Sequence, residues 1–172
     1  LNLKTTPDAL PYFKTEENIE LFERQKVLSK EEVQSRYEIL MDEYEKQINI
    51  EALTMLDIAK KDILPAASKF SKELTDTISN KKAIGIDLTY ELETAKKVSE
   101  YLTEAYQALI TLEKDVEKLH SIDDFEKSAF YVRDFIIQDM AALRKPCDKL
   151  EVITSNSDWP FPTYGKLLFG IL

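Results

Sequence analysis

The sequence predicts an all-α protein, an antiparallel bundle of three long helices with a short N-terminal helix and a C-terminal tail. Only 3 of the 172 residues are Gly and 6 are Pro, and few glycines mean few left-handed turn positions. Along three stretches, apolar residues recur at steps of three and four, which is typical of an amphipathic helix and not of a strand. Short connections between such stretches indicate an up-down-up topology.

Residues 1–14 contain Pro7 and Pro11. Because a proline disfavours the helical conformation of the residue before it, this stretch is predicted to be an extended connector. Thr15 has the character of an N-cap, and two glutamates follow it in what would be the first turn. We expect a short helix that ends near residue 25.

The first long helix should begin at residues 29–32, where Ser-Lys-Glu-Glu forms a capping box. Its apolar stripe continues to about residue 79. The stripe consists of Val33, Tyr37, Leu40, Tyr44, Ile48, Ala52, Met55, Ala59, Ile63, Ala66, Phe70, Leu74 and Ile78. Pro65 interrupts it and crowds the carbonyl of Lys61. We predict a kink near Pro65, and the alternative is a short break with a new helix that starts at this proline.

Two further long helices follow a predicted loop at 80–86, which contains Gly85. Asp87 is a candidate cap for the second helix, and residues 121–124 (Ser-Ile-Asp-Asp) are a candidate cap for the third. The second stripe comprises Leu88, Leu92, Ala95, Val98, Leu102, Tyr106, Leu109, Leu112, Val116 and Leu119. The third comprises Phe125, Ala129, Val132, Ile136, Met140, Leu143 and Leu150. Pro146 is expected to kink or shorten the third helix. The predicted bundle domain is therefore 15–153.

The tail at 154–172 becomes apolar and aromatic after a polar start. Two prolines stiffen it, and aromatic residues are favoured anchors at protein interfaces. One interpretation is a tail folded onto its own bundle, and the other is an anchor into a neighbouring domain or subunit. The candidate interface residues are Trp159, Phe161, Tyr164, Leu168 and Phe169.

Composition disfavours several classes of partner. The formal net charge of −9 disfavours binding to nucleic acid and to an anionic membrane surface, since both need clustered basic residues. The single cysteine, Cys147, cannot form an internal disulfide, and nothing indicates an oxidising compartment. No run of residues is apolar enough for a membrane span. The chain begins with Leu1 and not Met, which is compatible with a piece of a longer chain or with processing.

No pattern of catalytic, cofactor-binding or metal-binding residues emerges. The three glycines lie too far apart for a phosphate-binding loop. The one histidine, His120, lies at a predicted helix C-terminus, where interaction with the helix dipole or solvent exposure explains it. Glu117 with His120 has the Glu-x-x-His spacing of half a di-metal site, but such a site needs a second copy. Cys147 is expected to be a structural thiol. Acidic pairs such as Asp123–Asp124 and Glu31–Glu32 lie in first helical turns and are explained by capping.

Several runs resemble the region downstream of the catalytic core in type III glutamine synthetases, a large bacterial class. The most specific are Glu-Ala-Leu-Thr-Met at 51–55 and Trp-Pro-Phe-Pro-Thr-Tyr at 159–164. The resemblance extends over further runs at 5–11, 21–24, 27–29, 35–39, 63–66, 140–144, 148–151 and 167–169. It is weakest between about 71 and 128. The Pro146–Cys147 pair departs from the family pattern.

The resemblance implies a parent enzyme that makes glutamine from glutamate, ammonia and ATP with Mg or Mn. In that family the nucleotide and metal ligands lie in the catalytic core, so no catalytic residue is carried over to this chain. It implies a non-catalytic C-terminal domain in a cytoplasmic enzyme of stacked hexameric rings, in which residues 1–14 join the core and the partners are the core and neighbouring subunits. The alternative is a free-standing helical adaptor that binds a partner helix, because bundles and adaptors share the same apolar period.

Overall fold

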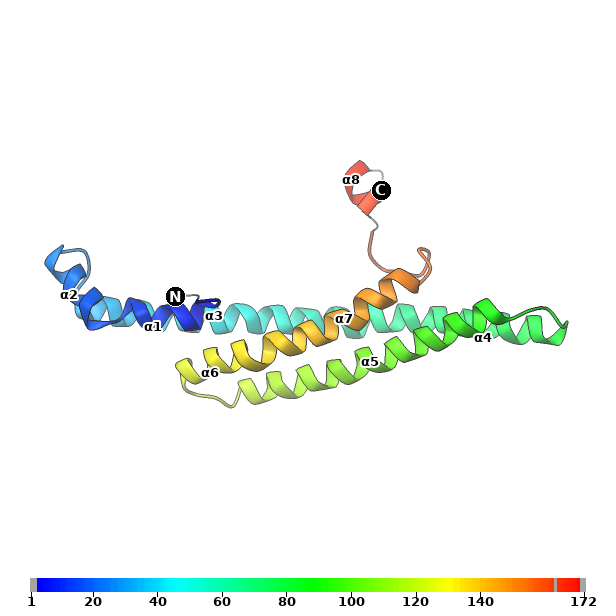
Figure 1. Ribbon diagram of the computed structural model, residues 1–172, viewed down its shortest axis with the longest axis horizontal. Coiled ribbons are helices and arrows are strands. Elements are labelled where there is room, and N and C mark those ends of the chain that lie inside the picture. Colours follow the sequence, from blue (N-terminus) through cyan, green and yellow to red (C-terminus); the bar gives the residue numbers. More distant parts are fainter. Residues whose placement is uncertain (1–2, 163, 171–172) are drawn as a thin grey trace. The chain divides into compact units, whose positions relative to one another are not determined.

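The computed structural model describes residues 3–162 and 164–170, and every regular element in this part of the chain is a helix (Figure 1). In chain order the elements are α1 (Thr6–Phe13), α2 (Glu16–Arg24), α3 (Lys30–Ile58), η1 (Ala59–Ile63), α4 (Leu64–Ala83), α5 (Thr89–Leu119), α6 (Phe125–Tyr131), η2 (Val132–Ile136), α7 (Ile137–Ile153) and α8 (Tyr164–Phe169). The elements η1 and η2 are π-helical turns. The all-α prediction is confirmed.

The chain divides into two compact units. Unit 1 contains the described residues up to 53 together with 113–139, and unit 2 contains 54–112 with the described residues from 140 onward. Three helices, α3, α5 and α7, each contribute residues to both units without a break in the helix. The prediction of one antiparallel three-helix bundle concerns both units together and stays a prediction.

The predicted extended connector is wrong for most of its length, because α1 occupies Thr6–Phe13. The Thr5 side chain caps this helix by accepting a hydrogen bond from the backbone N–H of Asp8 at 3.4 Å. Pro7 lies in the first turn, where its missing N–H would have no helical partner in any case. Pro7 is also buried, so packing on unit 1 outweighs the conformational preference that suggested an extended chain.

The short N-terminal helix is confirmed as α2, with Thr15 at its N-cap position, although Thr15 makes no side-chain capping bond. The capping box before α3 is confirmed in full. The Ser29 Oγ accepts from the backbone N–H of Glu32 at 3.3 Å, and a Glu32 carboxylate oxygen accepts from the backbone N–H of Ser29 at 2.7 Å. Reciprocal capping of this kind satisfies two otherwise orphaned donors and fixes where the helix begins.

The core of unit 1 forms where Tyr37 and Met41 of α3 meet Ala129 of α6. All three are buried, and partly buried apolar groups of α1 and α6 pack around them. Leu40, which the predicted stripe placed in the core, is 40% exposed, while its neighbour Met41 is fully buried. Steps of three and of four both satisfy the helical period, so the pattern left the choice between these two neighbours open.

Pro65 lies in the first turn of α4, directly after the π-turn η1. The backbone N–H of Leu64 bonds to the carbonyl of Ala59, five residues back. A π-turn widens the helix locally, and this relieves the crowding that Pro65 would cause at the carbonyl of Lys61. The chain therefore passes the proline without a loop, which counts against the alternative of a break, and the predicted kink itself stays a prediction.

The turn between α4 and α5 is shorter than the predicted loop at 80–86, because α4 continues to Ala83. Gly85 takes a left-handed conformation with φ +72°. The N–H of Ile86 bonds to the carbonyl of Lys81 at 3.2 Å, and the N–H of Gly85 bonds to that of Lys82 at 3.3 Å. This is a Schellman C-cap, which requires the left-handed residue that glycine supplies.

The third predicted helix is confirmed as the continuous series α6, η2 and α7. Asp124 is its N-cap and accepts a hydrogen bond from the backbone N–H of Lys127 at 2.8 Å. The π-turn at Val132–Ile136 was not predicted. Pro146 lies inside α7, which continues to Ile153, so the proline does not shorten the helix.

Candidate interaction surfaces

The start of the tail is held against α4 in unit 2. The Asp158 side chain is almost completely buried and forms an ion pair with Lys69 of α4, Nζ to Oδ1 2.8 Å. The backbone N–H groups of Asp158 and Trp159 both bond to the carbonyl of Ser155 at 2.9 Å. The Trp159 ring is half-buried and contacts the ring of Phe161 edge-on, with centroids 6.1 Å apart. This part of the tail is folded onto its own unit.

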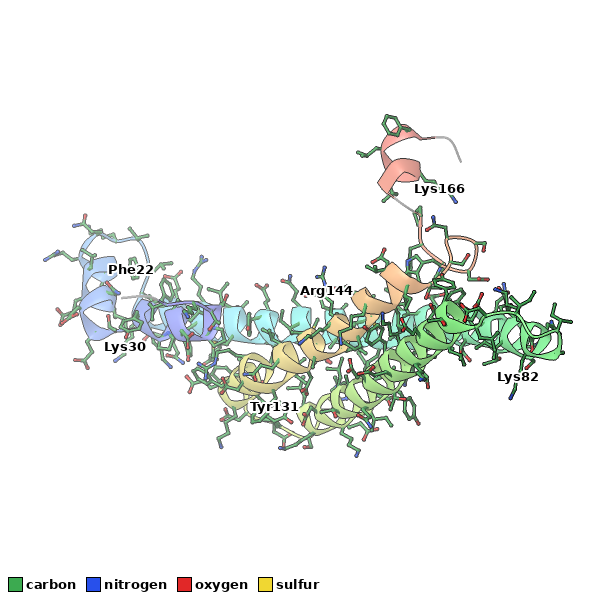
Figure 2. The ribbon with its side chains drawn as sticks, turned by 45° about the vertical axis from the view of Figure 1, so that its right-hand side comes forward. Phe22, Lys30, Lys82, Tyr131, Arg144 and Lys166 are labelled. Atoms are coloured by element: carbon green, nitrogen blue, oxygen red, sulfur yellow. The ribbon has the colours of Figure 1, made fainter. Side chains whose placement is uncertain are left out.

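The remainder of the tail is exposed. Phe161 is 38% exposed, and Leu168 and Phe169 of α8 are 72% and 78% exposed. Leu167 beside them is similarly open to solvent, and Figure 2 shows Lys166 on the same short helix. Of the five predicted interface residues, Trp159 is therefore partly covered, while three others present apolar surface. Tyr164 lies in α8, but its side chain falls outside the described part.

A second apolar surface, which the sequence did not indicate, is an open groove in unit 1 of about 910 Å³. The groove is lined by Phe13, Leu28, Glu31, Glu32, Ser35, Arg36, Ile39, Leu40 and Glu43. Four of these are apolar, and three carboxylates stand among them. Two of the apolar residues, Ile39 and Leu40, lie on α3 beside the buried positions of the core and could have been found from the excess of apolar residues on that helix.

One wall of this groove depends on α1, which polar contacts fix to the α6 and η2 segment. Lys14 pairs with Glu126, Nζ to Oε1 2.8 Å, and the same oxygen accepts a hydrogen bond from the Tyr37 hydroxyl at 2.5 Å. Arg133 pairs with Asp8, Nη1 to Oδ1 2.5 Å. Hydrogen bonds from Lys14 and Tyr37 lower the pKa of Glu126, whereas burial and the Glu126 contact raise that of Tyr37.

A carboxyl pair lies between α5 and α7 in unit 1. The Tyr131 hydroxyl, on the residue labelled in Figure 2, donates to Asp115 at 2.5 Å. Asp139 also faces Asp115, and a hydrogen bond between two carboxyl groups requires a proton on one of them. Burial first, and then the hydrogen bond and charge of Asp115, raise the pKa of Asp139 to about 6. The Tyr131 hydrogen bond lowers the pKa of Asp115, so Asp139 is the first of the two carboxyl groups to take up a proton as the pH falls.

The other residues that the sequence singled out are not brought together. Glu117 and His120 are exposed near the end of α5, and the His120 Nε2 lies 3.2 Å from the Asn49 Nδ2. Cys147 is buried in α7, where burial and the charge of Asp148 raise its pKa to about 11. Such a thiol stays protonated at neutral pH, which suits a structural role. Among the described residues, no cluster of three or more metal-ligating side chains occurs, and no helix has the length and apolar character needed to cross a membrane.

Comparison with known proteins gives consistent matches. A family model described as the glutamine synthetase C-terminal domain matches residues 1–82. A glutamine synthetase of Butyrivibrio fibrisolvens is 36% identical over 172 residues, which cover 99% of this chain and 25% of that protein. A type-3 glutamine synthetase of Dictyostelium discoideum is 32% identical over 98% of this chain and 24% of its own length. A glutamine synthetase of Bacteroides fragilis is 22% identical over similar shares.

The described part of this chain is helical, and its sequence is similar to a region of glutamine synthetases. Residues 1–82 match the glutamine synthetase C-terminal domain, and almost the whole chain aligns with a part of glutamine synthetases, which agrees with the resemblance drawn from the sequence. The chain spans about a quarter of the length of the curated relatives it matches.

Proposed function

We propose that this chain is the non-catalytic C-terminal domain of a type III glutamine synthetase and that it supports the packing of subunits. The observation that carries the proposal is the alignment of almost the whole chain with about a quarter of a type-3 glutamine synthetase. The whole enzyme is then an ATP-dependent glutamate–ammonia ligase. Its ATP and Mg or Mn bind the catalytic region, outside this chain.

The surfaces of the chain suit a role in assembly. Phe161, Leu168 and Phe169 present apolar area in the tail, and the groove in unit 1 presents more. Large exposed apolar patches are characteristic of protein–protein contacts. The partners that we propose are the catalytic region of the same polypeptide and neighbouring subunits, which build the stacked hexameric rings of the family in the cytoplasm.

The proposal is tested on the full-length protein with a Phe161→Asp/Phe169→Asp double variant. Burying a charged group in an apolar contact is costly, so the substitutions should remove most of the free energy that favours association. Sedimentation velocity should therefore show smaller particles than for the wild type. Glutamine formation per remaining intact assembly should change less than about twofold, because no group of the chemistry is touched. Val152→Asp is the matched control, since Val152 is 89% exposed and lies outside the tail.

An unchanged particle size for the double variant would contradict the assembly role. Glutamine formation by the 172-residue chain alone would contradict the non-catalytic role, since no turnover is expected without the catalytic region. The alternative function, a free-standing adaptor for a partner helix, is favoured by the apolar groove of unit 1. The reading frame decides between the two, because a Gly-rich catalytic region upstream in the same frame supports the ligase and a start codon directly before Leu1 supports the adaptor.

A further inference from the structure

The proposed assembly role leaves open what the exposed tail contacts, and the structure carries a candidate. We propose that the groove of unit 1 receives helix α8 from a second copy of this chain, as a helix-in-groove contact between subunits. This inference rests on the proposed function and deepens it, because it assigns a specific receptor surface to the tail.

The groove has the apolar floor that such a contact needs. Ile39 and Leu40 of α3 are 52% and 40% exposed, and Phe13 of α1 and Leu28 complete the apolar lining. Ile39 and Leu40 lie on α3 beside buried positions such as Met41, so this helix carries exposed apolar surface next to the core of unit 1. A groove lined in this way binds a short apolar helix through side chains that recur at steps of three and four.

Helix α8 matches the groove in size and composition. Its six residues span about 9 Å, and the groove residues of α3, from Glu31 to Glu43, span about 18 Å, so the helix fits within the groove. Leu167, Leu168 and Phe169 are all exposed, and Leu167 and Leu168 follow Tyr164 at steps of three and four. Each large apolar side chain that becomes buried contributes about 1.5–3 kcal/mol before the cost of association is counted.

Charge selects this occupant over other apolar helices. Glu31, Glu32 and Glu43 stand around the apolar floor with Arg36, and Lys30 lies beside Glu31. From residue 159 to residue 172, Lys166 is the only charged side chain. An acidic rim therefore meets a segment with a positive charge and no negative side chain. Complementarity of this kind favours the correct orientation and speeds encounter more than it adds affinity.

A second copy satisfies both surfaces at once. If two chains exchange their tails across a two-fold axis, each groove and each α8 is covered by the same contact, as an isologous interface requires. Because the same residues form both contacts, one pair of complementary surfaces is buried twice in the dimer. An apolar segment of another region of the full-length protein, or the chain's own tail, would leave no such reciprocal signature, and the experiment separates them.

The test is disulfide crosslinking between two differently labelled full-length chains in a Cys147→Ala background. One chain carries Ile39→Cys and the other carries Leu168→Cys. Oxidation of the mixture should give a heterodimer in at least tenfold higher yield than a control mixture in which Val152→Cys replaces Ile39→Cys. Circular dichroism verifies that every variant keeps its helix content, so that a low yield cannot come from unfolding.

A double variant with both cysteines in one chain gives the second readout. If it forms an intrachain disulfide at every dilution and the mixture gives no heterodimer, the chain's own tail occupies the groove and the proposal is overturned. If neither crosslink forms, α8 does not enter the groove, and the proposal is again overturned. A heterodimer with no excess over the Val152→Cys control would mean unspecific apolar contact and would also contradict it.

Charge reversal supplies an independent check. Glu43→Lys in the groove chain or Lys166→Glu in the tail chain should each lower the heterodimer yield about threefold, and the two together should restore it. The experiments distinguish a wrong assignment of the groove from a wrong proposed function. If the tail variants disrupt the full-length assembly but no tail-to-groove crosslink forms, the assembly role stands and only the groove assignment is wrong.

Discussion

At the scale of single residues, Asp139 is a carboxyl group whose pKa is raised to about 6 by burial and by the neighbouring Asp115. Its carboxyl is partly buried against α5, and one oxygen, Oδ2, has no hydrogen-bond partner among the described residues. The neighbouring Asp115 already accepts a hydrogen bond from Tyr131. Removing the proton from Asp139 therefore places two negative charges side by side in a region of reduced solvation.

We expect Asp139→Asn to stabilise the protein at neutral pH. The pKa of Asp139 is about 6 in the folded state against about 4 in an unfolded chain. The folded state therefore binds the proton more tightly, and wild-type stability falls as the pH rises from about 4 to about 6. Asparagine stays neutral and can still donate to Asp115, so the variant should gain about 1 kcal/mol at pH 7 and nothing near pH 4.

Urea denaturation at several pH values measures this difference. Asp76→Asn is the control, because Asp76 is exposed on α4 and its removal should leave the pH dependence of the wild type intact. Equal stabilisation by Asp139→Asn at pH 4 and pH 7 would show that the effect comes from packing and not from the titration of Asp139.

At the scale of elements, Gly85 determines how α4 ends. Its φ of +72° lies in the left-handed region, and a Cβ added there would meet nothing within 4 Å. The cost of a side chain is therefore conformational and not steric crowding by neighbours. We expect Gly85→Ala to destabilise the chain by about 1 kcal/mol in urea denaturation.

Gly85→Asn is the comparison variant. Asparagine tolerates the left-handed conformation better than alanine does, so its cost should be the smaller of the two. If both variants were as stable as the wild type, the C-cap of α4 would not depend on a left-handed residue, contrary to the hydrogen bonds of the turn.

Most helix starts could be predicted from the sequence, because they depend on local chemistry. The capping box at Ser29 and the cap at Asp124 are each made by side chains within three residues of the helix end. Helix α1 could not be predicted, because the burial of Pro7 and the ion pair of Asp8 with Arg133, far along the chain, stabilise it. No local feature of the sequence indicates the π-turn at 132–136. Pro65 indicates that the helix is disturbed near 59–63, but it does not indicate that the disturbance is a π-turn.

The candidate surfaces could be predicted only in part for a similar reason. The tail was found because its aromatic and proline content is unusual, but the sequence could not separate Trp159, which folds back on unit 2, from Phe169, which stays exposed. The groove was missed because Leu40 and Met41 both fit the helical period. Which of them faces the core depends on the neighbours that unit 1 supplies, and these come from distant parts of the chain.

At the scale of the whole molecule, the helices α3, α5 and α7 decide whether the two units unfold separately. Each of them passes from one unit to the other within a continuous helix, so no loop separates the units. Melting one end of such a helix exposes backbone groups at the boundary and removes packed turns from the other unit. The chain should therefore unfold in one cooperative transition.

Leu143→Ala tests this prediction, because Leu143 is buried in the unit 2 part of α7. The substitution should lower the free energy of unfolding by about 3 kcal/mol. Hydrogen exchange should then show the same loss of protection for core amides around Tyr37 in unit 1 as for those around Leu143, since both exchange through the same global opening. Val152→Ala, at an exposed position of the same helix, should leave both sets unchanged. Loss of protection confined to unit 2 would mean that the units unfold independently despite the shared helices.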